Sequence, residues 1–297
     1  MRRLLIIGCG DVMRRALPQL VRRWQVLALV RRHDPQLEAL GVTQIEGDLD
    51  RPDSLRRLAG IADAVIHSAP PPPQGSGDPR TRNLIAALQR GKSLPRQLVY
   101  ISTSGVYGDC GGARVSEART PAAQSARAAR RVDAEQRLRR FGRQRGRPCR
   151  ISILRAPGIY AEDRLPLERL HKGLPLMLPA EDSHTNHIHA ADLGRACIAA
   201  LTRAGANRTY NISDDSSLAM GEWFDALADA FALPRAPRLP REDVRRSVPP
   251  MQWSFMAESR RLDNTRMKRE LRLRLRYPDV ATGIAAAQQH SGTPCSG

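Results

Sequence analysis

The feature that most constrains the fold is the regular alternation of short apolar runs with longer helical stretches in the first half of the chain. Strands separated by helices pair in parallel, and near-continuous apolar runs are typical of a sheet that is buried on both faces. The sequence therefore predicts an α/β protein with a doubly wound parallel sheet. The runs that predict strands are residues 4–7, 25–30, 43–46, 64–68, 97–102 and 150–154.

The second half of the chain loses this alternation after Pro157 and becomes rich in proline and arginine. We interpret residues 1–164 as the sheet domain and residues 165–285 as a smaller substrate or lid region. Within the latter, residues 209–212 are expected to return to the sheet as one more strand. Residues 286–297 are predicted to form a disordered tail, because their end is small and polar.

A glycine-containing loop directly follows the first predicted strand and opens the first predicted helix. Gly8 allows a tight turn, and Gly10 removes a side chain that would hold the backbone away from a pyrophosphate at the helix N-terminus. A third glycine is missing, so the helix is expected to lie slightly further from the strand. The alternative is an ordinary turn with incidental glycines, but in this context the loop predicts a Rossmann-type dinucleotide site. Its residues are Gly8, Cys9, Gly10, Asp11, Val12 and Met13.

The cofactor preference is predicted from the residues that follow the second strand. An acidic residue there would bind a ribose 2′-hydroxyl, whereas this chain has Arg31 and Arg32, whose guanidinium groups suit a 2′-phosphate. We therefore expect NADP, with NAD as the alternative. Asp48 and Leu49, after the third strand, are expected to contact the adenine.

Four stretches together resemble the extended and atypical short-chain dehydrogenase/reductases, the NAD-dependent epimerase/dehydratase family. They are GCGDVM at 8–13, GDL at 47–49, YISTSGVYGD at 100–109, and RAPGIY at 155–160 with IHAADL at 188–193. The resemblance runs from Leu4 to about Ile284. It implies that Thr103 hydrogen-bonds the reacting oxygen, with Ser104 as a substitute. It also implies that the cofactor is lined by Ser68, Ala69 and Pro70, and that the nicotinamide is contacted by Pro157, Gly158 and Ile159.

The chain departs from this family at its acid–base pair. The family's helix carries Tyr-x-x-x-Lys, but the alignment puts Arg127 at the tyrosine position and Arg131 at the lysine position. Arg131 is expected to hold the cofactor's ribose hydroxyls, whereas the Arg127 guanidinium does not deprotonate in proteins. The candidates to replace the tyrosine are Tyr160 and His187, and the simpler interpretation of Tyr160 is a packing role.

The amino-acid composition limits which binding partners and which cellular location we expect for this chain. The net charge is +18, but 45 of the 48 basic residues are arginines and aromatic residues make up only 4%. Such a bias indicates a basic surface rather than a platform for stacking bases, so we do not expect a nucleic-acid partner. Five scattered cysteines favour a reduced, cytoplasmic setting, and no stretch is long enough to span a membrane. No metal site is expected, because His187 and His189 lack a third ligand.

Two functions remain open at this point. The first is an NAD(P)-dependent oxidoreductase or epimerase/dehydratase-like enzyme that acts on a small carbonyl, hydroxyl or nucleotide-sugar substrate. The alternative is a non-catalytic NADP-binding sensor or assembly protein that retains the fold, which the missing Tyr–Lys pair favours. The predicted helix within residues 122–141 carries a narrow apolar stripe, so a homodimer through this helix is an expectation, and a sheet-covering role is its alternative.

Overall fold

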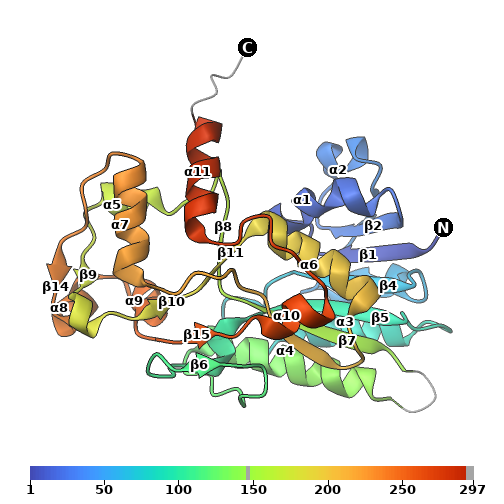
Figure 1. The fold of residues 1–297 in the computed structure, drawn as a ribbon. Helices are drawn as coiled ribbons and strands as arrows, with labels where there is room; N and C mark the ends of the chain where they lie inside the picture. The colour runs from blue at the N-terminus through green and yellow to red at the C-terminus, as the bar shows by residue number, and fades with distance from the viewer. Residues whose placement is uncertain (145–147, 292–297) are drawn as a thin grey trace.

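The centre of the molecule is a seven-stranded sheet in which all neighbouring strands are parallel (Figure 1). The computed structural model describes residues 1–144 and 148–291. The strand order is β12-β7-β5-β4-β1-β2-β3, so the order reverses beside β1 and the sheet is doubly wound. The predicted Rossmann-type α/β fold is confirmed. The strands are β1 (Arg3–Ile7), β2 (Gln25–Val30), β3 (Thr43–Glu46), β4 (Ala64–His67), β5 (Gln97–Thr103), β7 (Arg150–Ala156) and β12 (Arg208–Asn211).

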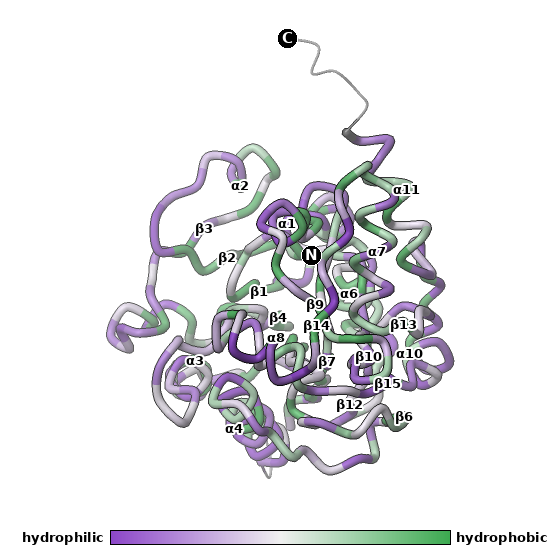
Figure 2. Tube along the Cα trace, turned by 90° about the vertical axis from the view of Figure 1, so that its left-hand side faces the viewer, coloured by the Kyte–Doolittle hydropathy of each residue, from purple (hydrophilic) through white to green (hydrophobic). Residues whose placement is uncertain are grey.

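Helices cover both faces of this sheet because alternate strand residues point to opposite sides. In β1, Leu4 and Ile6 belong to one buried cluster, while Leu5 and Ile7 belong to the other. Figure 2 shows the hydrophobic character of β1 and β2 within the sheet. The first face is covered by α1 (Asp11–Leu20), α2 (Pro35–Ala39) and α6 (Ala190–Arg203). The second is covered by a 3₁₀ helix (Pro52–Leu58), α3 (Pro79–Gln89) and α4 (Ala126–Gly142).

The apolar stripe of α4 is buried within the chain. Ala134, Leu138 and Phe141 pack into the cluster that covers the second face of the sheet. The sheet-covering role considered for this stripe is therefore present. The proposed dimer through residues 122–141 stays a prediction.

Beside the sheet, a second core is formed by elements of the predicted lid region, of which residues 167–177 and 220–256 lie at the left of Figure 1. This core contains Trp223, Phe224 and Leu227 from one helix and Ile284 from another. The short strands pair two by two: β8 with β11, β9 with β14, β10 with β13 and β6 with β15. These strands are β6 (Arg114–Val115), β8 (Gly158–Tyr160), β9 (Leu176–Met177), β10 (His184–Thr185), β11 (His187–His189), β13 (Leu218–Ala219), β14 (Arg238–Leu239) and β15 (Arg261–Leu262).

Other than α6, six α-helices are described in the second half of the chain, and all but two of them are short. They are α5 (Leu167–His171), α7 (Met220–Ala230), α8 (Arg241–Ser247), α9 (Pro250–Met256), α10 (Thr265–Glu270) and α11 (Val280–Ser291). The tail predicted from residue 286 begins instead as part of α11, because Ala287 is fully buried and Ile284 packs on the second core. Residues 292–297 of that predicted tail lie outside the described residues. Among the described helices, none has the length and apolar character needed to cross a bilayer.

Candidate active site

Two cavities lie at the carboxyl ends of the parallel strands, where ligands of open α/β sheets bind. The first, which we call the β1–β4 cavity, has a volume of about 1070 Å³ and is lined by the residues that follow β1, β2, β3 and β4. The second, the lid cavity, has a volume of about 420 Å³. It lies between the ends of β5 and β7 and the lid helices α5, α7 and α9.

The backbone of the loop after β1 forms the floor of the β1–β4 cavity. Gly8 has φ +88, and a Cβ there would stand 2.5 Å from the amide nitrogen of Ala69, so no other residue fits without a shift. Gly10 is the N-cap of α1, and a Cβ there would meet nothing within 4 Å. The space in front of Gly10 and the N–H groups of the first turn of α1 fit the pyrophosphate of a dinucleotide.

The remaining loop residues lie elsewhere. Met13 is fully buried against the sheet, where the third glycine is missing. Asp11 binds Arg15, with Nε 2.9 Å from its carboxylate, and Arg164, with Nη1 at 3.2 Å. Neither Met13, Val12 nor Asp11 lines the β1–β4 cavity. The helix that comes close to this turn is α6, where a Cβ on Gly194 would lie 3.1 Å from the Val12 carbonyl oxygen.

The segment after β4 closes the opposite wall. The amides of Ser68 and Ala69 donate to the Ile7 carbonyl at 2.9 and 3.0 Å, which ties this wall to the end of β1. Pro70 accepts from the Arg80 side chain at 3.0 Å. All three predicted residues of this segment line the cavity, together with Asp48 and the mostly buried Leu49.

The outer end of the β1–β4 cavity is basic. Arg31 and Arg32 are exposed on its rim, and Arg51 joins them. Of the acidic groups nearby, Asp34 and Asp50 are each paired with an arginine, while Asp48 in the cavity lining forms no ion pair with a described residue. Arg14 binds the carboxylate of Asp34 and thereby lowers its pKa.

A second pair lies on the same rim. Arg80 forms a two-point contact with Asp50 at 2.8 and 2.6 Å and likewise lowers the pKa of that carboxyl. The sequence did not single out Arg51 or Arg80, because arginines are too common in this chain for one to stand out.

Thr103 stands at the end of β5, on the edge of the lid cavity. Its Oγ1 accepts a hydrogen bond from the Gly105 amide at 3.2 Å and retains its own hydroxyl proton for a ligand. Pro157, Gly158 and Ile159 line the same cavity, from the segment that follows β7. The structure thus brings Thr103 together with the residues predicted to contact the nicotinamide.

The two arginines of α4 have different surroundings. Arg131 donates to the Ile101 carbonyl at 2.7 Å and to the Tyr100 hydroxyl at 3.1 Å, so part of its guanidinium is held against β5. Arg131 does not line either cavity. Arg127 lines the lid cavity with its guanidinium carbon 3.9 Å from the centre of the Phe255 ring, and burial lowers its pKa.

Tyr160 forms part of the wall of the lid cavity but is held at both ends. The Tyr160 hydroxyl donates to the carbonyl of Asp279 at 3.4 Å. The Tyr160 ring packs so closely on Gly283 that a Cβ added to this glycine would lie 2.4 Å from the tyrosine hydroxyl oxygen. Burial, followed by nearby carboxylates such as Asp214, raises the pKa of Tyr160. The phenol therefore stays protonated, and its contacts match those of a packing residue.

His187 also lines the lid cavity and is 5% exposed. Burial lowers its pKa to about 3, so the ring is neutral at pH 7. The Trp223 ring packs on the His187 ring with centroids 4.5 Å apart. The Nδ1 atom of His187 has no hydrogen-bond partner in the described part of the chain. His189, by contrast, caps α6 and stacks on Tyr277 with centroids 3.7 Å apart, which is a structural role.

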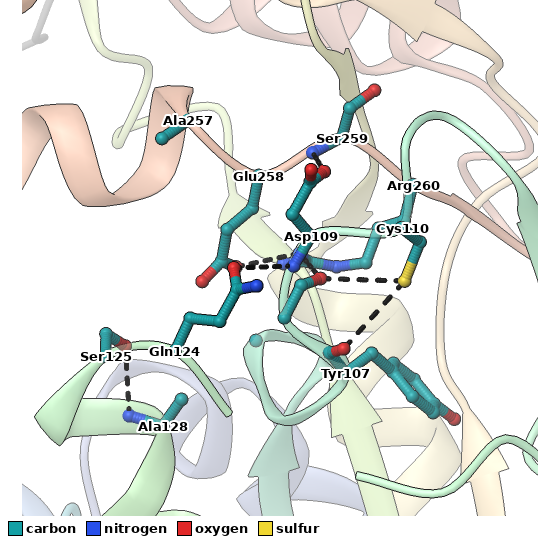
Figure 3. A network of polar contacts seen from close by, with 12 residues as sticks. Tyr107, Asp109, Cys110, Gln124, Ser125, Ala128, Ala257, Glu258, Ser259 and Arg260 are labelled. Carbon is teal, nitrogen blue, oxygen red and sulfur yellow. Dashed lines mark hydrogen bonds and ion pairs between the residues drawn. The ribbon is translucent and has the colours of Figure 1, made fainter. Parts of the chain in front are cut away.

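The lid is fastened to the loop after β5 by a network of polar contacts (Figure 3). Asp109 accepts a hydrogen bond from the Ser259 amide at 2.7 Å. Arg260 donates to the carbonyl of Gly108 at 2.8 Å and to the carboxylate of Glu258 at 2.7 Å. Asp109, which follows the VYG motif, therefore holds the lid rather than facing the cavity. Among the described residues no cluster of three or more metal-ligating side chains occurs.

Comparison with known proteins agrees with this geometry. The family model described as NAD(P)H-binding matches residues 8–204, which include the loop after β1 and most of the sheet. The 2-alkyl-3-oxoalkanoate reductase of Stenotrophomonas maltophilia (strain K279a) is 40% identical over 114 residues, or 35% of this chain. The match spans about a third of that relative, 34% of its length.

Solved structures share the whole fold. A functionally unknown conserved protein from Silicibacter pomeroyi has a TM-score of 0.80 at 25% identity, covering 99% of this chain and 100% of its own. The UDP-glucose 4-epimerase of Thermotoga maritima, solved with UDP-glucose, has a TM-score of 0.75 at 17% identity, covering 97% and 98%. The resemblance predicted from the motifs is confirmed, and the chain belongs to the NAD(P)H-binding family.

Proposed function

We propose that this protein is an NADP-dependent oxidoreductase that interconverts a small carbonyl compound and its alcohol. The reduction adds a hydride from NADPH to the carbonyl carbon and a proton to the carbonyl oxygen, leaving NADP⁺. Thr103 orients that oxygen through its hydroxyl. The proton comes from water, because the His187 ring is neutral, the Tyr160 hydroxyl is held by the Asp279 carbonyl and a guanidinium does not release a proton. The observation that carries the proposal is that Thr103 and the segment after β7 line one cavity, at the same carboxyl edge of the sheet as the β1–β4 cavity.

The preference for NADP rests on charge at the rim of the β1–β4 cavity. Arg31, Arg32 and Arg51 line this end, while Asp34 and Asp50 are each bound by another arginine. Asp48 is the remaining carboxylate of the described lining, so the three arginines leave an excess of positive charge that a 2′-phosphate would balance and a bare hydroxyl would not.

The cofactor assignment is tested by titrating the protein with NADPH and with NADH while its fluorescence reports binding. We expect NADPH to bind at least about tenfold more tightly, and the double change Arg31→Gln and Arg32→Gln to remove that ratio while leaving NADH binding intact. Arg57→Gln, an exposed change outside the cavity, is the matched control. Equal affinity of the two nucleotides for the unchanged protein would contradict the NADP assignment.

A carbonyl panel assayed by NADPH oxidation tests the catalytic role of Thr103. On any substrate that is reduced, Thr103→Ala is expected to lower kcat about 100-fold, the lower end of what general acid–base and orienting groups contribute. Thr103→Ser keeps a hydroxyl and should recover most of the rate. An unchanged kcat in Thr103→Ala would remove this residue from the chemistry.

A non-catalytic sensor is the second candidate, and one observation favours it. Arg127 lines the cavity in which the family has its tyrosine, and Arg131 is held against β5, so neither can pass a proton. The panel separates the two functions: NADPH binding without turnover on any carbonyl or alcohol would favour the sensor.

A further inference from the structure

The lid cavity has an unbalanced set of charges. Four arginines line it, Arg127, Arg164, Arg169 and Arg260, and Glu258 is its one carboxylate among the described residues. The two histidines that line it do not correct this balance, since His187 is neutral and neither side chain carries negative charge. The cavity is therefore strongly positive before any ligand enters.

Three of these arginines have partners that account for their position. Arg260 binds Glu258, and Arg164 binds Asp11 outside the cavity. Arg169 has no carboxylate partner, but its terminal nitrogens donate to the side chain of Gln252 at 2.9 Å and to the carbonyl of Pro175. Arg169 and Arg260 thus hold segments of the lid, while Arg164 ties the segment after β8 to α1.

Arg127 is different, because its one recorded contact is with the face of the Phe255 ring, and no described carboxylate pairs with it. Burial lowers the pKa of this half-buried guanidinium, and the nearby Glu258, which is already bound to Arg260, opposes that shift only in part. The guanidinium N–H groups form a planar fork that matches both oxygens of a carboxylate. Arg127 is the one lining arginine that forms no hydrogen bond or ion pair with a described residue, so a single carboxylate is enough to satisfy its fork.

The surroundings of Arg127 describe the rest of the ligand. Thr103, Gly105 and Arg127 line the same cavity, and a Cβ on Gly105 would lie 3.5 Å from Thr103 Oγ1. The remaining wall of the cavity is apolar and is formed by Trp223, Phe224 and Met256 with the half-exposed Phe255. A ligand that satisfies all of these groups carries an anion, a reacting oxygen close to it and an apolar tail.

We propose that the lid cavity binds an amphipathic oxo- or hydroxy-carboxylate, with Arg127 binding its carboxylate and Trp223 and Phe224 packing on its tail. This inference deepens the proposed function, because it names the substrate class of the same cavity. It assigns Arg127 to substrate binding instead of proton transfer.

Calorimetry on the protein saturated with NADP⁺ tests this assignment without requiring turnover. The probes are acetate, hexanoate and 3-phenylpropanoate, each compared with its uncharged amide. We expect hexanoate and 3-phenylpropanoate to bind at least about tenfold more tightly than their amides, and more tightly than acetate. Arg127→Gln should abolish the preference for the acid, and Arg127→Lys should keep part of it.

The matched control is Arg140→Gln, which removes the same charge from an exposed position on the same helix and should leave acid binding unchanged. Circular dichroism and thermal unfolding check that each variant is folded. The inference is overturned if none of the acids binds more tightly than its amide, or if Arg127→Gln keeps the preference. Binding of NADPH, measured on the same samples, reports on the proposed function separately, since it depends on the other cavity.

Discussion

The two cavities of this molecule are built in opposite ways. The β1–β4 cavity is formed by backbone at the ends of four neighbouring strands, and glycines determine how closely a ligand approaches. The lid cavity is formed by side chains from segments that lie far apart in the chain, from Thr103 to Arg260. The geometry of a site formed by backbone limits it to one class of ligand. In a site formed by side chains, substitution of single residues is enough to change the ligand.

The largest effect is expected at Gly8, where the backbone has no freedom. Gly8→Ala should lower the free energy of unfolding by about 2–4 kcal/mol, through left-handed backbone strain and overpacking against Ala69. Urea unfolding measures this change. Gly41→Ala is the control, since Gly41 has φ +75 but no atom near its Cβ position, so it carries the strain alone. Equal losses in the two variants would mean that the contact with Ala69 does not limit this site.

Gly10→Ala tests whether ligand binding in one cavity can be changed without an effect on folding or on binding in the other cavity. The methyl group has room within the protein, so the free energy of unfolding should change by less than about 0.5 kcal/mol. The same methyl group stands where the pyrophosphate approaches, so the Kd for NADPH should rise about tenfold or more. Acid binding in the lid cavity should not change. A normal Kd for NADPH in Gly10→Ala would contradict the assignment of the diphosphate to this loop.

Acid should destabilise both regions through one histidine each. Burial lowers the pKa of His67, at the end of β4, and of His187, in the lid cavity, from 6.5 to about 3. Below pH 6.5 the unfolded chain takes up protons that the folded chain excludes, so stability is complete above pH 6.5 and is lost as the pH falls toward 3. At pH 5.5 each histidine should cost about 1.4 kcal/mol relative to pH 8. Urea unfolding at both pH values measures the loss of unfolding free energy. In His187→Gln this loss should be smaller by the contribution of one histidine, about 1.4 kcal/mol.

The smallest effect is expected where the lid is fastened. Asp109→Ala removes the acceptor for the amides of Ser259 and Gly111, at 2.7 and 3.2 Å, and should cost about 1 kcal/mol. Because this contact orders the lid, KM for a carbonyl substrate should rise about fivefold while the Kd for NADPH stays the same. Asp243→Ala, on the exposed side of α8, is the control. A change in NADPH affinity in Asp109→Ala would show that the two cavities are not independent.

The sequence predicts the first region well because its signals are periodic and local. Apolar runs such as 4–7 and 25–30 predicted β1 and β2, and residues 209–212 predicted the strand that appears as β12. The loop from Gly8 to Gly10 could be interpreted because it lies between a strand and a helix. Met13 shows the limit of that pattern, since a residue of the loop points into the core.

The second region could not be predicted in the same way. Strands of two or three residues, such as β9 and β15, are too short to show any alternation. Arg127 is visible in the sequence as a departure at one position, but 44 other arginines hide the fact that it lacks a carboxylate partner. Asp109 is visible in the sequence only as the end of the motif at 100–109, and its contact with Ser259 joins positions 150 residues apart. Such contacts depend on the tertiary fold alone.

The return of the chain to the sheet at β12 ties the lid to its support. Because β12 pairs with β7 and is followed by α7 to α11, a fragment ending at residue 164 would leave β7 as an open edge. Unpaired edges with apolar residues such as Ile151 and Ile153 invite association between chains. The second half of the chain is therefore not a separable unit, and changing the specificity of the lid cavity requires substitution of individual side chains within the intact chain.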